Sequence, residues 1–236
     1  MALYAISDTH LSFSSQKSMT VFGGRWLDYE NKLKTNWLET VGTEDWVVIP
    51  GDISWGMSLE ESLEDFRFLA ALPGRKIIGK GNHDYWWSTL KKLNSFAAER
   101  GLGGIYFLHN NAYLCGDLVV CGTRGWFVEE GALGPPEDYK VLLREAGRLR
   151  ASIAEAKKIQ TANPGSKIRL FLHYPPIYGD YFCPEIMEVL EEEGIERCYY
   201  GHIHTASAPR IVRKYKGIEF ALISADYLNF KPVLVE

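Results

Sequence analysis

The sequence predicts an α/β fold, and two features of the 236-residue chain indicate it. In the first half, short apolar runs alternate with segments whose apolar residues recur every three or four positions, a pattern typical of strands alternating with helices. That order implies right-handed crossovers and parallel strands. In the second half, one long segment with helical spacing interrupts a series of short apolar runs. The pattern fits one domain, built on a mixed sheet or on two stacked sheets flanked by helices.

The first half contains three predicted pairs of a strand and a helix. The strands are short apolar runs at Leu3–Ser7, Trp46–Ile49 and Arg75–Ile78. The helices are a segment near Asp28–Val41, a segment that follows the capping-box sequence Ser58–Glu61, and a segment from Leu90 that stops near Gly101.

The second half predicts shorter strands around one long helix. Ala112–Cys115 and Leu118–Cys121 are separated by two residues, a spacing typical of a hairpin. After a loop at Gly131–Pro136, the apolar spacing predicts a helix over about Glu137–Gln160. The other predicted elements are strands at Ile105–Leu108, Lys167–Leu172 and Arg197–Tyr200, a short helix at Pro184–Leu190, and antiparallel strands at Ile211–Val212, Ile218–Ile223 and Pro232–Val235.

Composition narrows the class of protein. The net charge is −4 and there is no strongly basic segment, so broad electrostatic binding to nucleic acid is not favoured. None of the four cysteines forms a Cys-x-x-Cys pair, which disfavours a thiolate zinc site and indicates a reducing compartment. The first residues have the pattern of a strand and not of a signal peptide, and no apolar run approaches the roughly 20 residues of a membrane span. We expect a soluble, cytoplasmic protein.

Histidines mark the candidate site. Five of the six histidines lie just past predicted strands: His10, His83, His173, His202 and His204. In open α/β sheets, binding sites form beyond the carboxyl ends of the strands. Imidazoles that gather there beside carboxylates favour a metal centre.

Two motifs in the first half supply carboxylates. Asp8 and His10 are two residues apart, and in an extended chain such residues point to the same side and can hold one ion together. Asp52 follows Gly51, which allows a sharp turn at the end of the second strand. Each motif also fits an ordinary turn without a metal site, because Asp beside a surface His and the dipeptide Gly-Asp are both common in turns.

Three further motifs contain the other candidate site residues. After Gly81, Asn82 offers a neutral oxygen ligand, His83 a titratable proton, and Asp84 a carboxylate that can orient the His83 ring. This tetrad also fits a polar turn that starts a helix. His173 ends a strand and precedes two prolines that fix the chain direction. His202 and His204 share one side through their spacing, after a glycine that gives room.

Together, the five motifs in this order resemble the calcineurin-like metallophosphoesterase superfamily, which includes purple acid phosphatases. The resemblance extends from Asp8 to His204. It implies a sandwich of two mixed β-sheets flanked by helices, formed as a single domain by residues 1–236. It also implies two divalent or trivalent metal ions, and the oxygen and nitrogen ligands are compatible with manganese, iron or zinc.

The resemblance implies a role for each motif residue. The ligands of the first ion would be Asp8, His10, Asp52 and His204. Asp52 would bridge to a second ion, whose other ligands would be Asn82, His173 and His202. A metal-bound hydroxide would attack phosphorus in line, while His83 protonates the leaving oxygen and Asp84 orients His83.

The substrate side is less defined. Many relatives have a phosphate-contacting arginine after the third motif, and here Arg124 is preferred over Arg100. The segment Leu11–Trp26 is either a substrate loop or a disordered connection. Aromatic residues crowd the motifs as core packing or as a wall for a nucleobase or aryl group: Trp55, Tyr85, Trp86, Trp87, Trp126, Tyr174, Tyr178 and Tyr181.

The expected activity is metal-dependent hydrolysis of a phosphodiester or phosphomonoester. The expected substrate is a phosphorylated small molecule or a nucleotide, and nucleic acid and membranes are not favoured as partners. The alternatives are a metal-dependent nuclease, a non-catalytic scaffold of the same fold and a structural metalloprotein. Retention of His83 and Asp84 counts against the last two, because a site without catalysis does not require them. The sequence leaves the oligomeric state, the native metals and the monoester or diester preference open.

Overall fold

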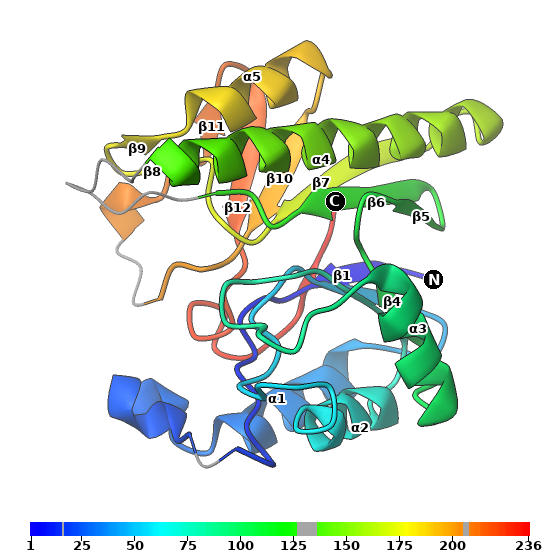
Figure 1. The fold of residues 1–236 in the computed structure, drawn as a ribbon, viewed down its shortest axis with the longest axis vertical. Coiled ribbons are helices and arrows are strands. Elements are labelled where there is room, and N and C mark those ends of the chain that lie inside the picture. Colours follow the sequence, from blue (N-terminus) through cyan, green and yellow to red (C-terminus); the bar gives the residue numbers. More distant parts are fainter. Residues whose placement is uncertain (16, 127–135, 205–207) are drawn as a thin grey trace.

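A computed structural model describes residues 1–15, 17–126, 136–204 and 208–236, and it contains two large mixed sheets (Figure 1). The first sheet has the order β13-β1-β2-β3-β4. Its strands are β1 (Leu3–Ala5), β2 (Trp46–Ile49), β3 (Arg75–Ile78), β4 (Ile105–Phe107) and β13 (Val233–Leu234). All neighbours are parallel except β13, which pairs antiparallel with β1. These strands confirm the parallel order predicted for the first half.

The second sheet has the order β11-β12-β10-β7-β6-β5. Its strands are β5 (Ala112–Cys115), β6 (Leu118–Thr123), β7 (Lys167–Leu172), β10 (Arg197–Tyr200), β11 (Lys214–Tyr215) and β12 (Ile218–Leu222). The four central strands are parallel and the two edge strands are antiparallel. The predicted hairpin is β5–β6.

Helices cover the outer face of each sheet, and a third core lies between the sheets (Figure 1). The first sheet packs against α1 (Tyr29–Thr40), α2 (Leu63–Ala71) and α3 (Leu90–Glu99), and the second against α4 (Pro136–Ala162) and α5 (Pro184–Glu192). On β2, Val47 and Ile49 face the helices while Trp46 and Val48 belong to the core between the sheets. This period-two alternation is what a strand buried on both faces requires. The two-sheet sandwich flanked by helices is confirmed.

Some predicted elements differ from the structure. Ile211–Val212 forms no strand, because the Ile211 side chain packs into the core under α4 and α5 while the ladder starts only at β11. The tail strand β12 is parallel to β10 and not antiparallel to it. Ser58 starts a turn and α2 begins only at Leu63, although Ser58 Oγ does accept a hydrogen bond from the Glu61 amide at 3.2 Å. The predicted loop Gly131–Pro136 lies outside the described residues apart from Pro136, where α4 begins.

Short elements that the apolar pattern did not predict add to this framework. They are the 3₁₀ helices η1 (Met19–Phe22), η2 (Gly24–Trp26) and η3 (Ala208–Arg210) and the hairpin of β8 (Ile177–Tyr178) with β9 (Tyr181–Phe182). The second half of the segment Leu11–Trp26 therefore forms the two 3₁₀ helices η1 and η2. None of the described helices has the length and apolar character needed to cross a membrane.

The two sheets are joined just beyond the end of β1. Ser7 forms an isolated parallel bridge with Ser224, which follows β12 of the other sheet. Its amide donates to the Ile223 carbonyl at 2.7 Å, and its carbonyl accepts from the Ala225 amide at 2.8 Å. The carboxyl ends of the parallel strands of both sheets consequently meet at one place, where the predicted motifs lie.

Candidate metal centre

Four of the predicted ligands occupy left-handed backbone conformations. The φ angles are 60° at Asp8, 44° at His10, 53° at Asp52 and 67° at His202. The Asp8–His10 pair therefore converges through a turn and not through the extended geometry that the sequence spacing suggested. A left-handed non-glycine residue costs roughly 1–3 kcal/mol, and such strain concentrates at functional sites. Backbone hydrogen bonds hold the turns together, with the Asp8 amide donating to Gly51 and the His10 amide to Asp52.

Two glycines allow the turns to approach each other. A Cβ atom on Gly81 would overlap the Asp52 carboxylate, and one on Gly201 would overlap the Asp8 carboxylate. The His202 amide also donates to both carboxylate oxygens of Asp8, at 3.1 and 3.0 Å. These contacts bring ligands from the two sheets within reach of each other.

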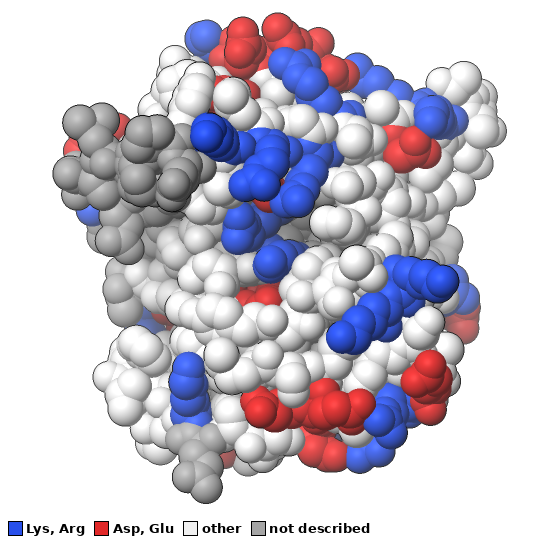
Figure 2. Space-filling view, viewed as in Figure 1, with Lys and Arg blue, Asp and Glu red and all other residues white. Residues whose placement is uncertain are grey.

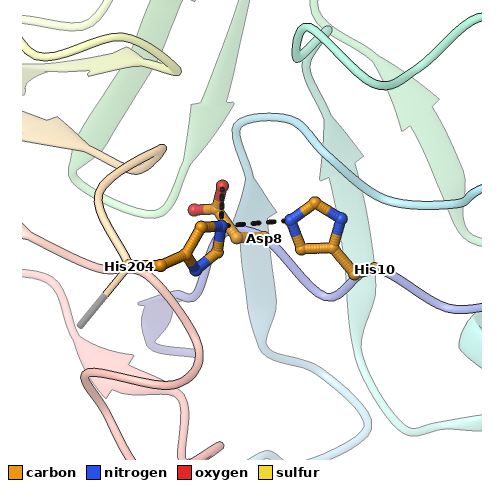
Figure 3. A group of neighbouring side chains, drawn as sticks. All are labelled: Asp8, His10 and His204. Carbon is orange, nitrogen blue, oxygen red and sulfur yellow. Dashed lines mark hydrogen bonds and ion pairs between the residues drawn. The ribbon is translucent and has the colours of Figure 1, made fainter. Parts of the chain in front are cut away.

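The first group of ligands consists of Asp8, His10 and His204 (Figure 3). The Nε2 atoms of His10 and His204 lie 3.2 Å apart, and His204 Nε2 lies 3.9 Å from Asp8 Oδ1. All three potential ligand atoms are within 4.8 Å of one another. One ion could contact the three side chains together.

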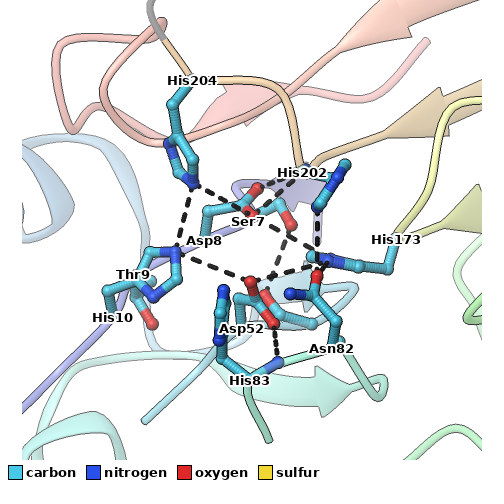
Figure 4. A network of polar contacts seen from close by, with 12 residues as sticks. Ser7, Asp8, Thr9, His10, Asp52, Asn82, His83, His173, His202 and His204 are labelled. Atoms are coloured by element: carbon cyan, nitrogen blue, oxygen red, sulfur yellow. Dashed lines mark hydrogen bonds and ion pairs between the residues drawn. The ribbon is translucent and has the colours of Figure 1, made fainter. Parts of the chain in front are cut away.

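The second group consists of Asp52, His173 and His202, and Asn82 joins it (Figure 4). Asn82 Oδ1 lies 2.7 Å from His173 Nε2 and 3.0 Å from His202 Nδ1. The amide oxygen and the two imidazoles thus face a common point, as expected for ligands of one ion.

Asp52 lies between the two groups. Its Oδ2 atom is 3.6 Å from His10 Nε2 in the first group and 3.6 Å from His173 Nε2 in the second. Its Oδ1 atom accepts from the His83 amide at 2.8 Å, which fixes the carboxylate in this position. The geometry is that of a carboxylate able to contact two ions.

The buried charges of the site match a cationic ligand. Burial, followed by the charges of Asp84 and Asp8, raises the pKa of Asp52 well above its usual range. Burial and neighbouring histidines lower the pKa values of His10 and His173, and they lower the pKa of His202 to about 4. The polar atoms His10 Nδ1, Asp52 Oδ2 and His173 Nδ1 are buried without a hydrogen-bond partner among the described residues. Neutral imidazoles and an unpartnered carboxylate oxygen are suitable metal ligands, and bound cations would compensate the negative charge.

His83 lies beside this centre. Its ring centroid is 5.7 Å from that of His10 and 4.4 Å from that of Trp55. Burial, then the charges of Lys17 and His204, lower its pKa. Its Nδ1 atom is buried and has no hydrogen-bond partner in the described part of the chain. The ring is thus not used by the surrounding hydrogen-bond network.

The structure places Asp84 differently from the predicted role. Its carboxylate accepts hydrogen bonds from the amides of Asp52 at 2.8 Å, Ile53 at 2.8 Å and Gly81 at 2.7 Å, and from the Trp86 indole at 3.1 Å. No hydrogen bond between Asp84 and the His83 ring occurs, although both residues are described. The short turn after Gly81 directs the Asp84 carboxylate toward the backbone amides of the Asp52 turn and not toward the His83 ring.

Asp226 is a site residue that the sequence motifs missed. Its Oδ1 atom lies 3.0 Å from His204 Nδ1, on the opposite side of the ring from the nitrogen that faces Asp8. Burial opposes protonation of His204, but the hydrogen bond to Asp226 raises its pKa. A carboxylate behind a ligating imidazole fixes the ring and increases its basicity.

Replacing Asp226 by asparagine is expected to weaken metal binding by about 10- to 100-fold, the range typical for loss of such a supporting carboxylate. The affinity of metal-stripped protein can be measured by competition with a chromophoric chelator. The exposed Asp117, in the turn between β5 and β6, provides the matched Asp-to-Asn control. Equal affinities of the two variants would remove Asp226 from the site.

The two candidate phosphate-binding arginines lie in different surroundings. The Arg124 carbonyl accepts from the His173 and Tyr174 amides, and its Nε atom is buried without a hydrogen-bond partner among the described residues. Its guanidinium lies 5.0 Å from the Trp126 ring and 3.9 Å from the buried Glu145 carboxylate. Basic side chains gather just below α4 on this face of the molecule (Figure 2). Arg100, in contrast, pairs with Glu60 at 2.7 Å on the surface.

The aromatic residues near the motifs divide into two sets. Trp86 is buried, contacts Phe66 edge-on at 4.9 Å and donates to Asp84, so it belongs to the core. Trp55 stacks on the His10 ring at 5.1 Å, with an angle of 25° between the rings. Tyr174 contacts the His202 ring edge-on at 4.5 Å, and Tyr85 contacts the His83 ring edge-on at 6.2 Å, so aromatic packing against the site comes from several motifs.

Comparisons with known proteins agree with this geometry. A family model described as calcineurin-like phosphoesterase matches residues 1–206. A comparison with curated proteins gives no match.

Solved structures are similar in fold. A protein of unknown function, AQ665 from Aquifex aeolicus, has a TM-score of 0.56 at 18% identity, and the match covers 99% of this chain and 95% of that one. The phosphopantetheinyl hydrolase PptH from Mycobacterium tuberculosis has a TM-score of 0.55 at 15% identity, with coverage of 99% and 95%. The protein TT1561 of Thermus thermophilus has a TM-score of 0.54 at 13% identity, with coverage of 99% and 97%. At these identities the likeness shows a shared fold.

Proposed function

Since the chain belongs to the calcineurin-like phosphoesterase family, we propose that it hydrolyses a phosphomonoester or phosphodiester of a small molecule or nucleotide at a two-ion centre. The observation that carries this proposal is the position of Asp52 Oδ2, 3.6 Å from one imidazole of each ligand group. A structural metal site would need only one group of ligands. Two adjacent groups that share a carboxylate are suited to a pair of ions.

The ligand set assigns residues to each ion. Asp8, His10 and His204 would hold the first ion, Asn82, His173 and His202 the second, and Asp52 both. Nitrogen and oxygen ligands without thiolates suit manganese, iron or zinc. Such a pair, when bound, lowers the pKa of a water molecule and neutralises phosphate oxygens.

His83 is the residue that would transfer a proton. Its ring lies beside the ligands, and the ring nitrogen Nδ1 has no partner in the described part of the chain. A phosphate group bound at the centre adds negative charge, which favours the imidazolium form that burial alone disfavours. The protonated ring would then donate its proton to the leaving oxygen. Asp84 supports this arrangement by accepting a hydrogen bond from the Asp52 amide. The Asp52 carboxylate in turn accepts a hydrogen bond from the His83 amide.

Arg124 would contact a non-bridging phosphate oxygen. Replacing it by alanine should lower kcat/KM by about 10-fold or more, because hydrogen bonds to charged groups contribute roughly 1.5–3 kcal/mol. Arg100→Ala is the matched control, since that guanidinium pairs with Glu60 away from the ligands and its loss should leave kcat/KM within about twofold. Steady-state measurement of kcat/KM for both variants tests the assignment of Arg124. The assignment fails if Arg100→Ala has the larger effect or if neither has one.

The proposed activity can be tested with metal-stripped protein re-supplied with manganese, iron or zinc. We expect metal-dependent hydrolysis of p-nitrophenyl phosphate, bis-p-nitrophenyl phosphate or both. The ratio of the two rates indicates the monoester or diester preference. Binding of metal without turnover of either ester would favour a non-catalytic scaffold.

A further inference from the structure

A cavity of about 320 Å³ opens directly beside the ligands of the first group. Its walls include the rings of His10, His83 and His204. The remaining walls are apolar and come from Met19, Phe22, Trp26 and Trp55. Three of these four residues lie in η1 and η2, so the folded end of Leu11–Trp26 forms a large part of the cavity.

Two of the apolar walls, Trp26 and Trp55, are held by contacts with their surroundings. Trp26 is almost completely buried and packs edge-on against His10 at 5.8 Å and His204 at 5.7 Å. Trp55 is held by stacking on His10, by its indole hydrogen bond to Met19 Sδ at 3.1 Å, and by the Lys17 ammonium 4.3 Å from its ring centroid. A cavity with rigid walls loses little conformational entropy when it binds a ligand.

Imidazole rings and apolar side chains share the lining of this cavity, which lies beside the metal ligands. The phosphoryl group is charged and cannot enter an apolar pocket without a large desolvation cost. It therefore stays at the metal ligands, where bound cations would compensate its charge. His83 lies next to both kinds of wall, since its ring centroid is 4.4 Å from that of Trp55 and 5.7 Å from that of His10.

We propose that this cavity is the leaving-group subsite and that the substrate is a phosphoester whose leaving group contains an uncharged aromatic ring. The inference rests on the proposed function, because it uses His83 as the donor to the leaving oxygen. A group attached to that oxygen lies on the His83 side of phosphorus, where the Trp55 ring is 4.4 Å from the His83 ring. The volume of about 320 Å³ is at the lower end of small-molecule sites, which suits a ring and not a polymer.

Phenylphosphonate and methylphosphonate test the inference, because they carry the same charged group, are not hydrolysed and differ only by the ring. Their affinities for metal-loaded protein can be measured by calorimetry or tryptophan fluorescence. Burial of a phenyl ring predicts a preference of about 10- to 100-fold for phenylphosphonate. The phosphonate analogues of adenosine 5′-phosphate and ribose 5-phosphate form a second pair, which distinguishes a nucleobase from an aryl group as the ring.

Phe22→Ala should reduce the preference for the ring several-fold, because this side chain lines the cavity yet is 59% exposed and is not needed for the core. Val21→Ala is the matched control on the same 3₁₀ helix, 77% exposed and outside the cavity lining, and it should leave the preference unchanged.

Equal affinities within both ligand pairs, in protein that still hydrolyses p-nitrophenyl esters with metal, would overturn the inference and leave the proposed function standing. Absence of both phosphonate binding and ester hydrolysis in metal-loaded protein would overturn both. An equal effect of Phe22→Ala and Val21→Ala on the preference would also contradict the assignment of the cavity.

Discussion

Replacing His83 by glutamine should lower kcat by about 10²- to 10⁴-fold for esters with an alkoxide leaving group, the usual contribution of a positioned general acid. Glutamine retains a polar side chain but cannot donate a proton from a titrating group. The substitution should leave metal content unchanged, because the ring of His83 belongs to neither ligand group. Rates with alkyl and p-nitrophenyl esters, measured with the metal content, give the result.

The leaving group provides an internal control for this prediction. p-Nitrophenolate departs readily without a proton, so its ester should lose much less rate in the variant than an alkyl ester does. His109→Gln is the matched control at the other histidine outside both ligand groups, and it should retain the rate with both esters. Equal losses on the two esters would show that His83 positions the site and does not protonate the leaving oxygen.

Replacing Asp52 by asparagine should have the largest effect on the metal centre. An amide carries no negative charge and is a poor bridge between two cations, so one ion should be lost or bound much more weakly. The loss of one ion removes several kcal/mol of stabilisation of phosphate charge. Since each 1.36 kcal/mol corresponds to a tenfold change in rate, we expect kcat to fall by about 10³-fold or more. Metal content per chain and kcat should be measured on the same preparation.

Stability separates this effect from unfolding. The Asp52→Asn substitution keeps a carbonyl oxygen that can accept from the His83 amide, and it removes a carboxylate disfavoured by burial and by its neighbours Asp84 and Asp8. The metal-free variant should therefore unfold at the same temperature as the metal-free wild type or higher. If the metal-free variant is less stable than the metal-free wild type, its loss of activity would come from unfolding and not from the loss of an ion. Full activity with two bound ions would contradict the bridging role.

Much of the ligand set was predictable because each motif is local and the fold brings strand ends together. The motif at Asp8 and His10 follows β1 of the first sheet, and the motif at His202 and His204 follows β10 of the second. The carboxyl ends of the parallel strands of the two sheets meet at the bridge between Ser7 and Ser224. The left-handed φ values at Asp8 and His10 were not predictable from spacing, because they depend on hydrogen bonds to a turn more than 40 residues away in the chain. The proximity of Asp8 and His10 was thus expected from an incorrect local geometry.

Other features depend on tertiary contacts without a local pattern. Asp226 follows β12 in an ordinary stretch of sequence, and only the bridge between Ser7 and Ser224 brings it behind His204. Asp84 is next to His83 in sequence, which favoured a direct contact, yet its carboxylate accepts from the amides around Asp52. Apolar periodicity left open whether there is one sheet or two, because it reports which residues are buried and not the sheet to which they belong.

The proposed activity needs two ions per chain, and a metal titration tests this requirement most directly. Metal-stripped protein should be titrated with manganese, with bound metal per chain and the rate of ester hydrolysis measured in the same samples. We expect two ions per chain and a rate that rises as the second one binds. Full turnover with a single ion per chain would contradict the two-ion centre, as would two bound ions without turnover of either ester with manganese, iron or zinc.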